Sequence, residues 1–109
     1  MAYCTTADVL AIVDTDITVL EIADLIDRTD ARIDVLIDPL VTPALILEDI
    51  SSLWTAYRVM LKDPNARSLG EYSERRDKAL ELIKQELNEL IAMVSGGGIS
   101  FTVASESLA

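Results

Sequence analysis

The chain has 109 residues, a net charge of −10, and hydrophobic side chains at 50% of its positions. Its length allows one small domain, and its acidity excludes ordinary binding to nucleic acid or to anionic membranes, because both depend on lysine and arginine. One layer of helices does not readily hide so large an apolar fraction. We therefore expect self-assembly or a protein partner.

The side chains offer little for catalysis or for binding a metal. The sequence has no histidine, and its single cysteine, Cys4, can form neither an internal disulfide nor a structural zinc site. The segment Asp14–Glu21 fails as a calcium loop, because Val19 stands where the turn glycine is required. We therefore expect no enzymatic activity, no metal and no cofactor. A lone thiol suits a reducing cytoplasm.

A membrane span is not expected either. The longest uncharged run, Leu90 to Ser105, contains three glycines and falls short of the ~20 apolar residues that a spanning helix needs.

The first two helices are predicted from their starting residues. Thr5 or Thr6 begins a helix that runs to about Val13, because a threonine hydroxyl can accept hydrogen bonds from the free amides of the first turn. A turn follows at 14–16. Thr18 and Glu21 then form a capping box that opens a second helix over 19–38.

The second helix divides into faces. Its apolar stripe consists of Ile22, Leu25, Ile26, Ile33, Leu36 and Ile37. Acidic residues at three- and four-residue steps are assigned to the opposite side: Asp24, Asp27, Asp30, Asp34 and Asp38. Arg28 and Arg32 share a flank between the two. Either this is a solvated face on which Asp24 supports Arg28 at i, i+4, or the arginines of one copy meet the aspartates of the next.

The third helix is expected over 43–62, with Thr42 as its cap and Pro43 in its first position. Its apolar residues cover most of its circumference, which indicates a central helix with neighbours on several sides. Trp54 and Tyr57 are therefore interpreted as core side chains.

The fourth helix is expected over 69–94, about 39 Å long, after a capping box made by Ser68 and Glu71. Arg76 falls inside its apolar stripe. Either this side chain reaches water along its aliphatic stem, or it forms an ion pair with an aspartate of the second helix, within one subunit or between two.

The C-terminal segment differs from the rest. A glycine hinge, Gly96, Gly97 and Gly98, precedes an alternating run in which Ile99, Phe101 and Val103 point one way. A lone strand cannot satisfy its own backbone groups, so the segment is either a frayed terminus or a strand that adds to another chain's sheet. The expected fold is thus an all-α bundle of about four helices over 1–95, followed by a hinge and a partner-binding tail over 96–109.

Three stretches resemble the small helical head–tail connector (adaptor) proteins of tailed viruses. They are "YCTTADVLAIV", "ITVLEIADLIDRTDARIDVLI" and "LKDPNARSLGEYSERRDKALELI", the last containing a "G-x-Y-S" start to the terminal helix. The resemblance implies a virion protein at the head–tail interface, assembled in the host cytoplasm. It also implies a ring, commonly of twelve copies, beneath the portal protein, and a docking surface for a stopper or tail-completion protein.

The same resemblance gives roles to particular residues. The tail residues Ile99, Phe101 and Val103 would bind the portal, and the acidic face of the second helix would line a channel that DNA crosses without specific contacts. Arg28, Arg32 and Arg76 would lie there or between subunits. The alternative function is that of a cytoplasmic helical interaction or regulatory protein acting as a small dimer.

Overall fold

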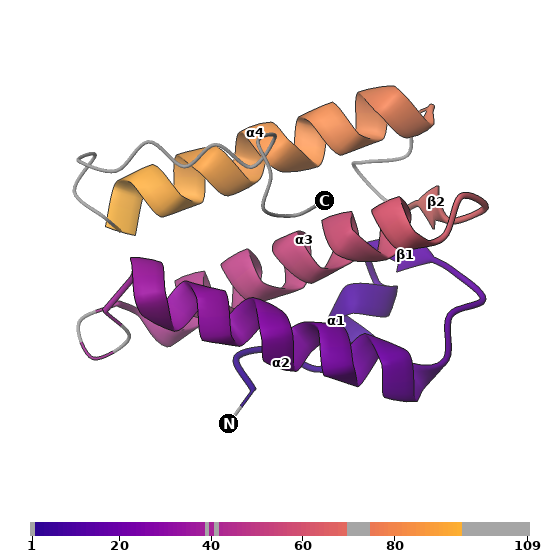
Figure 1. Ribbon diagram of the computed structural model, residues 1–109. Helices are drawn as coiled ribbons and strands as arrows, with labels where there is room; N and C mark the ends of the chain where they lie inside the picture. Colours follow the sequence, from indigo (N-terminus) through magenta and orange to yellow (C-terminus); the bar gives the residue numbers. More distant parts are fainter. Residues whose placement is uncertain (1, 39, 41, 70–74, 95–109) are drawn as a thin grey trace.

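The computed structural model describes residues 2–38, 40, 42–69 and 75–94. Over these ranges the elements are α1 (Thr6–Leu10), β1 (Val13–Asp14), α2 (Val19–Leu36), α3 (Ala44–Lys62), β2 (Arg67–Ser68) and α4 (Arg76–Val94). Figure 1 shows α3 between α2 and α4, and α1 packs against α2 and α3. The predicted helical bundle is confirmed. The hinge and tail residues, 96–109, lie outside the described residues.

The first two helices begin as predicted. The Thr5 hydroxyl accepts a hydrogen bond from the Asp8 amide at 3.2 Å, and the Asp8 carboxylate accepts one from the Thr5 amide at 2.9 Å. The Thr18 hydroxyl accepts from the Glu21 amide, also at 3.2 Å. Short polar side chains thus satisfy amides that a helix leaves unpaired at its start.

The start of α3 differs from the prediction. Pro43 is the N-cap residue and makes no side-chain cap, so the expectation that Thr42 caps this helix is wrong. The Thr42 hydroxyl instead donates to the main-chain carbonyl of Asp38 at 2.8 Å. Its hydrogen-bonding capacity is used inside the connection from α2 and is therefore not available to the helix.

Two short strands, which the sequence analysis did not predict, join distant parts of the chain. Val13 pairs with Ser68 and Asp14 with Arg67 in an antiparallel ladder, and the Leu69 amide donates to the Ile12 carbonyl at 2.7 Å. An extended backbone over 67–69 excludes helix there, so the predicted helix start at Leu69 and the capping role of Ser68 are wrong. Helix α4 begins at Arg76, and at 19 residues it is about 28 Å long.

The core lies on both sides of α3. Trp54 is only 1% exposed, and Ala56, Val59 and Met60 on the same helix are fully buried, which confirms the prediction of a central helix. The predicted apolar stripe of α4 is also confirmed from Ala79 onward, since its fully buried residues are Ala79, Ile83, Leu87 and Ile91. Other large apolar side chains remain exposed, namely Leu10, Val19, Leu20, Val35, Leu40, Leu45, Leu61, Leu69 and Met93.

Candidate interaction surface

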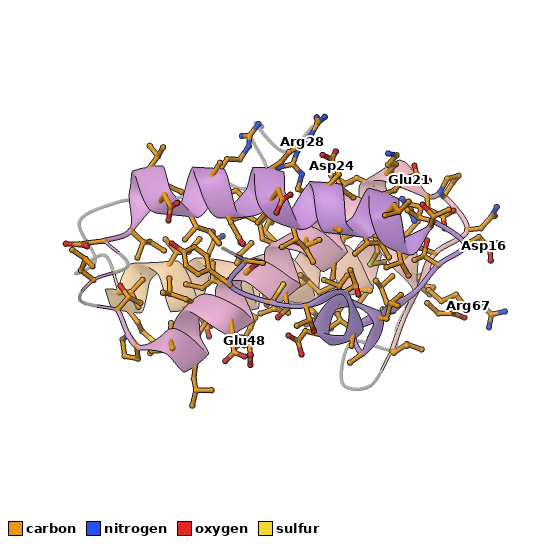
Figure 2. All side chains as sticks on the ribbon, turned by 90° about the horizontal axis from the view of Figure 1, so that it is seen from below. Asp16, Glu21, Asp24, Arg28, Glu48 and Arg67 are labelled. Carbon is orange, nitrogen blue, oxygen red and sulfur yellow. The ribbon has the colours of Figure 1, made fainter. Side chains whose placement is uncertain are left out.

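The outer side of α2 carries exposed charges of both signs. Arg28 and Asp24 form an ion pair of 3.0 Å, with both side chains about two-thirds exposed, which confirms the predicted i, i+4 support. Figure 2 shows the two side chains next to each other on the outside of the helix. Asp27 and Asp34 are exposed as well. Because exposed ion pairs contribute little to stability, the Arg28–Asp24 pair remains open to exchange for another partner.

Asp30 does not belong to that exposed acidic face. Its side chain is buried, at 6% exposure, and its assignment to the side opposite the apolar stripe is wrong. One carboxylate oxygen accepts a hydrogen bond from the Ser51 hydroxyl at 2.6 Å, and the other accepts from the Tyr3 amide at 2.8 Å. Burial raises the pKa of this carboxyl, and its two hydrogen bonds act in the opposite direction. Asp30 therefore ties the N-terminal segment to α2 and α3.

Two further side chains of the N-terminal segment join this network. The Ser51 hydroxyl lies 3.2 Å from the Cys4 sulfur, and burial raises the pKa of that thiol to about 11. The Tyr3 hydroxyl donates to the Asp34 carboxylate, and this hydrogen bond is the main cause that raises the Tyr3 pKa to about 12. A thiol that stays protonated at neutral pH is a poor nucleophile. The arrangement is suited to holding the chain in place.

Arg58 on α3 is a charged residue that the sequence analysis missed. Burial lowers the pKa of its guanidinium, and the neighbouring charges of Arg32 and Arg28 lower it further. Its Nη1 atom is buried and has no hydrogen-bond partner among the described residues. We call Arg28, Arg32 and Arg58 the arginine group. The signal in the sequence was the spacing, because Arg58 follows the core residue Trp54 by four positions and so shares its face.

Arg76 stabilises the end of α3. Its guanidinium donates one hydrogen bond to the main-chain carbonyl of Met60, and another, of 3.2 Å, to that of Asp63. These carbonyls lie at the C-terminal end of the helix, where partners within the helix run out and a cation is favoured. Over the described ranges, no ion pair joins Arg76 to an aspartate of α2. A contact of Arg76 with another subunit stays a prediction.

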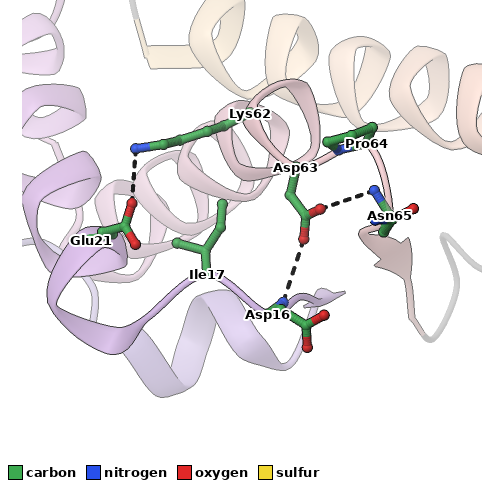
Figure 3. Close-up of a pocket in the computed structure, with 7 residues that line it drawn as sticks. All are labelled: Asp16, Ile17, Glu21, Lys62, Asp63, Pro64 and Asn65. Atoms are coloured by element: carbon green, nitrogen blue, oxygen red, sulfur yellow. Dashed lines mark hydrogen bonds and ion pairs between the residues drawn. The ribbon is translucent and has the colours of Figure 1, made fainter.

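A surface pocket of about 340 Å³ lies where α2 begins and α3 ends (Figure 3). Lys62 pairs with Glu21 at 3.2 Å on one side of it. On the other side the Asp63 carboxylate accepts from the Thr15 hydroxyl at 2.5 Å and from the Asn65 amide at 2.9 Å. The Thr15 hydrogen bond is the main cause that lowers the pKa of Asp63. Lys62 and Glu21 thus pair with each other, and Asp63 is held by neutral donors, as expected for a structural joint.

The described residues were also searched for a metal cluster and for a membrane-spanning helix. Where side chains are described, no cluster of three or more cysteine, aspartate or glutamate residues could hold a metal ion. None of the helices in those ranges has the length and apolar character that crossing a bilayer requires. Comparison of the chain with family models, with curated proteins and with solved structures finds no match.

Proposed function

We propose that this protein is a head–tail connector of a tailed virus. In this proposal copies form a ring beneath the portal, extend the DNA channel and offer a docking surface to the next tail-completion protein. The resemblance of the sequence to such connectors supports the proposal, as does the helical bundle with its acidic surface. The protein would act in the virion, after assembly in the host cytoplasm.

The observation that carries the proposal is the set of large apolar side chains that the folded chain leaves exposed. Leu40 is 92% exposed, and Leu20, Val35 and Leu45 are at least three-quarters exposed. Leu20, Val35 and Leu45 lie on α2 or α3, whose opposite faces already fill the core, and Leu40 lies in the link between these helices. None of the described residues covers them. Assembly with other chains would remove this surface from water.

The charge of the outer surface fits a passage for DNA. Asp24, Asp27 and Asp34 are exposed along α2. Arg28 pairs with Asp24 on the same side, but carboxylates outnumber the arginines there, and an excess of negative charge repels phosphate. In the proposed ring these residues line the channel, so that DNA slides through without being held. The tail residues Ile99, Phe101 and Val103 add a strand to the portal, a role that lies outside the described residues.

Reconstitution with the portal protein encoded in the same genome tests the proposal. The purified chain is mixed with purified portal at micromolar concentration and examined by electron microscopy and light scattering. We expect a ring attached to the portal, and we expect Phe101→Asp to weaken the attachment at least ~10-fold, because a charge would enter an apolar pocket. Phe101→Leu is the matched control. Absence of any association with portal at these concentrations would rule the connector function out.

A small regulatory dimer is the second candidate, because the same exposed apolar residues could be covered by one partner copy. The two functions differ in the order of assembly and in genetic context. A connector forms rings or joins a portal, and its gene lies next to portal and capsid genes. A regulatory dimer is stable in isolation, has no affinity for portal and lies next to the gene for its target.

A further inference from the structure

We propose that the C-terminal segment of the unassembled subunit covers an apolar surface at one end of its own helical bundle, through Ile99, Phe101 and Val103. The contact needs no second protein. Its release rests on the proposed connector function, in which the same three side chains bind the portal protein.

The surface lies where α2 ends, α3 begins and α4 ends. Figure 1 places these three helix ends at the same end of the molecule. The large apolar side chains there that are mostly exposed form what we call the apolar end: Val35, Leu40, Leu45 and Met93. Others beside them are only half buried, namely Leu36, Ile46, Leu90 and Val94. A surface of this kind is unfavourable in water and marks a place where something docks.

Charged residues are rare around the apolar end. From residue 35 to residue 47 the sequence contains a single one, Asp38, and from 90 to 94 it contains none. The outer side of α2 differs, because Asp24 and Asp27 are exposed there. An apolar segment can therefore cover the apolar end without removing many charges from water, which would be costly.

The chain continues from this same end. Residues 95–109 follow Val94, the last residue of α4. Because an extended chain spans at most about 3.6 Å per residue, Ile99 stays within about 18 Å of Val94. Leu20, which is exposed at the start of α2, lies at the opposite end of the bundle in Figure 1, about the 28 Å length of α4 away. Ile99 can thus reach the apolar end but not the exposed residues at the start of α2.

The composition of the segment fits this surface. Residues 95–105 carry no charge, and the alternation over 99–103 gives the segment one apolar face. To lie over the end from which it departs, the chain has to reverse its direction just after α4. The glycines at 96–98 permit such a turn, because glycine adopts backbone angles that other residues avoid.

Tethering decides between the subunit's own segment and that of a second copy. A short flexible linker gives an effective concentration on the order of millimolar, far above the concentration of other copies in a micromolar solution. The subunit's own segment therefore occupies the apolar end first. When portal binds Ile99, Phe101 and Val103, the apolar end becomes free for a neighbouring copy, so contacts between subunits form at the portal and not before.

Thiol labelling of the full chain tests the contact. Leu45→Cys places a thiol in the apolar end, and Leu20→Cys is the matched control at the opposite end, since the two leucines are 75% and 82% exposed. The native Cys4 is buried in both variants. Each variant is combined with Phe101→Asp and with Phe101→Leu and labelled at several protein concentrations. Circular dichroism verifies that every variant is folded.

The expected pattern is specific. The Leu45→Cys thiol reacts at least ~10-fold more slowly than the Leu20→Cys thiol, because the segment has to open before the reagent enters. Phe101→Asp removes this protection, Phe101→Leu keeps it, and the rate does not depend on protein concentration. Under mild oxidation, Leu45→Cys combined with Phe101→Cys forms a disulfide within one chain, whereas Leu20→Cys combined with Phe101→Cys does not.

Two results would overturn the inference. One is equal labelling of the two thiols with no effect of Phe101→Asp. The other is protection that grows with protein concentration, or a disulfide that joins two chains, because a second copy would then cover the apolar end. The portal reconstitution is scored separately. Attachment to portal without protection of the Leu45→Cys thiol would reject this contact and leave the connector function standing, and protection without attachment would do the reverse.

Discussion

The hydroxyl of Ser51 on α3 donates a 2.6 Å hydrogen bond to the buried carboxylate of Asp30 on α2. The same carboxylate accepts from the Tyr3 amide, so one side chain connects two helices and the N-terminal segment. Because the groups around it are largely removed from water, each depends on the others for its hydrogen bonds. This network makes Asp30 the charged residue of α2 whose removal we expect to destabilise the protein most.

Asp30→Ala should lower the free energy of unfolding by about 2–3 kcal/mol, because it leaves the Ser51 hydroxyl and the Tyr3 amide without an acceptor. Urea denaturation followed by circular dichroism measures the change. Asp27→Ala, an exposed position on the same helix, is the control and should stay within about 0.5 kcal/mol of the wild type. Equal effects of the two substitutions would contradict the structural role of Asp30.

Stability should also depend on pH through Asp30. Burial raises the pKa of this carboxyl, so the folded state holds the proton more tightly than the unfolded state. The associated stability is complete below the unfolded pKa and is lost as pH rises through the folded pKa. The difference in unfolding free energy between wild type and Asp30→Asn should therefore shift in favour of the variant as pH rises from acid to neutral. Glu21 and Asp63, whose pKa values are lowered, are present in both proteins, so their contributions to the pH dependence cancel in this difference. A pH-independent difference would contradict the prediction.

The Cys4 thiol should react slowly in the folded protein. It is 4% exposed and its pKa is raised to about 11, so at pH 8 the thiolate fraction is on the order of 0.1%. A chromogenic disulfide reagent should label Cys4 at a rate limited by opening of the N-terminal segment, and denaturant should make labelling fast. Asp30→Ala should accelerate labelling without denaturant, whereas Asp27→Ala should not. Immediate and complete labelling of the native wild type would show that the N-terminal segment is not held against α2 and α3.

Arg76→Ala should destabilise the protein by about 1–3 kcal/mol, because the carbonyls of Met60 and Asp63 lose a charged donor. Arg75→Ala removes the same charge at an exposed neighbouring position and serves as the control. Thermal and urea unfolding measure both variants. If Arg75→Ala destabilised the protein as much as Arg76→Ala, the effect would come from the charge of this region and not from the hydrogen bonds to the end of α3.

Deletion of residues 96–109 should leave the helical body folded. The buried core described here consists of residues between Cys4 and Ile91, so helix content and a cooperative thermal transition should persist while attachment to portal is lost. Circular dichroism and portal binding are measured on the same preparation. A deletion variant that fails to fold would show that the tail packs on its own subunit.

The local signals in the sequence predicted where the first two helices begin and that the third is central. They did not predict that α1 ends at Leu10, before about Val13, or that α4 begins at Arg76. Thr5 and Thr18 cap the helices as predicted, and the central position of α3 follows from its apolar circumference. The buried position of Asp30 could have been predicted, because Asp30 follows Ile26 by four residues and precedes Ile33 by three. This spacing places it on the apolar stripe. Its charge suggested exposure, and its hydrogen-bond partners, 21 and 27 residues away, gave no local sign.

Contacts between distant segments could not be predicted. The β1–β2 ladder consists of two residues in each strand, too short for a visible alternation, and its partners are more than 50 positions apart. The same ladder holds Ser68 in a strand, so the fourth helix cannot begin where this residue would cap it. In the candidate site, Arg28 and Arg32 were predicted from the sequence. Arg58 was not, because it lies on another helix and only the fold shows that the charges of Arg28 and Arg32 act on it.

The β1–β2 ladder gives the subunit a modular layout. The chain enters the α2–α3 pair after Asp14 and leaves it before Arg67, and these two residues are partners in the ladder. Figure 1 places the ladder at the opposite end of the pair from the C-terminal end of α2 and the start of α3. Evolution can therefore lengthen or shorten the link at that remote end without displacing the point from which the chain continues toward α4.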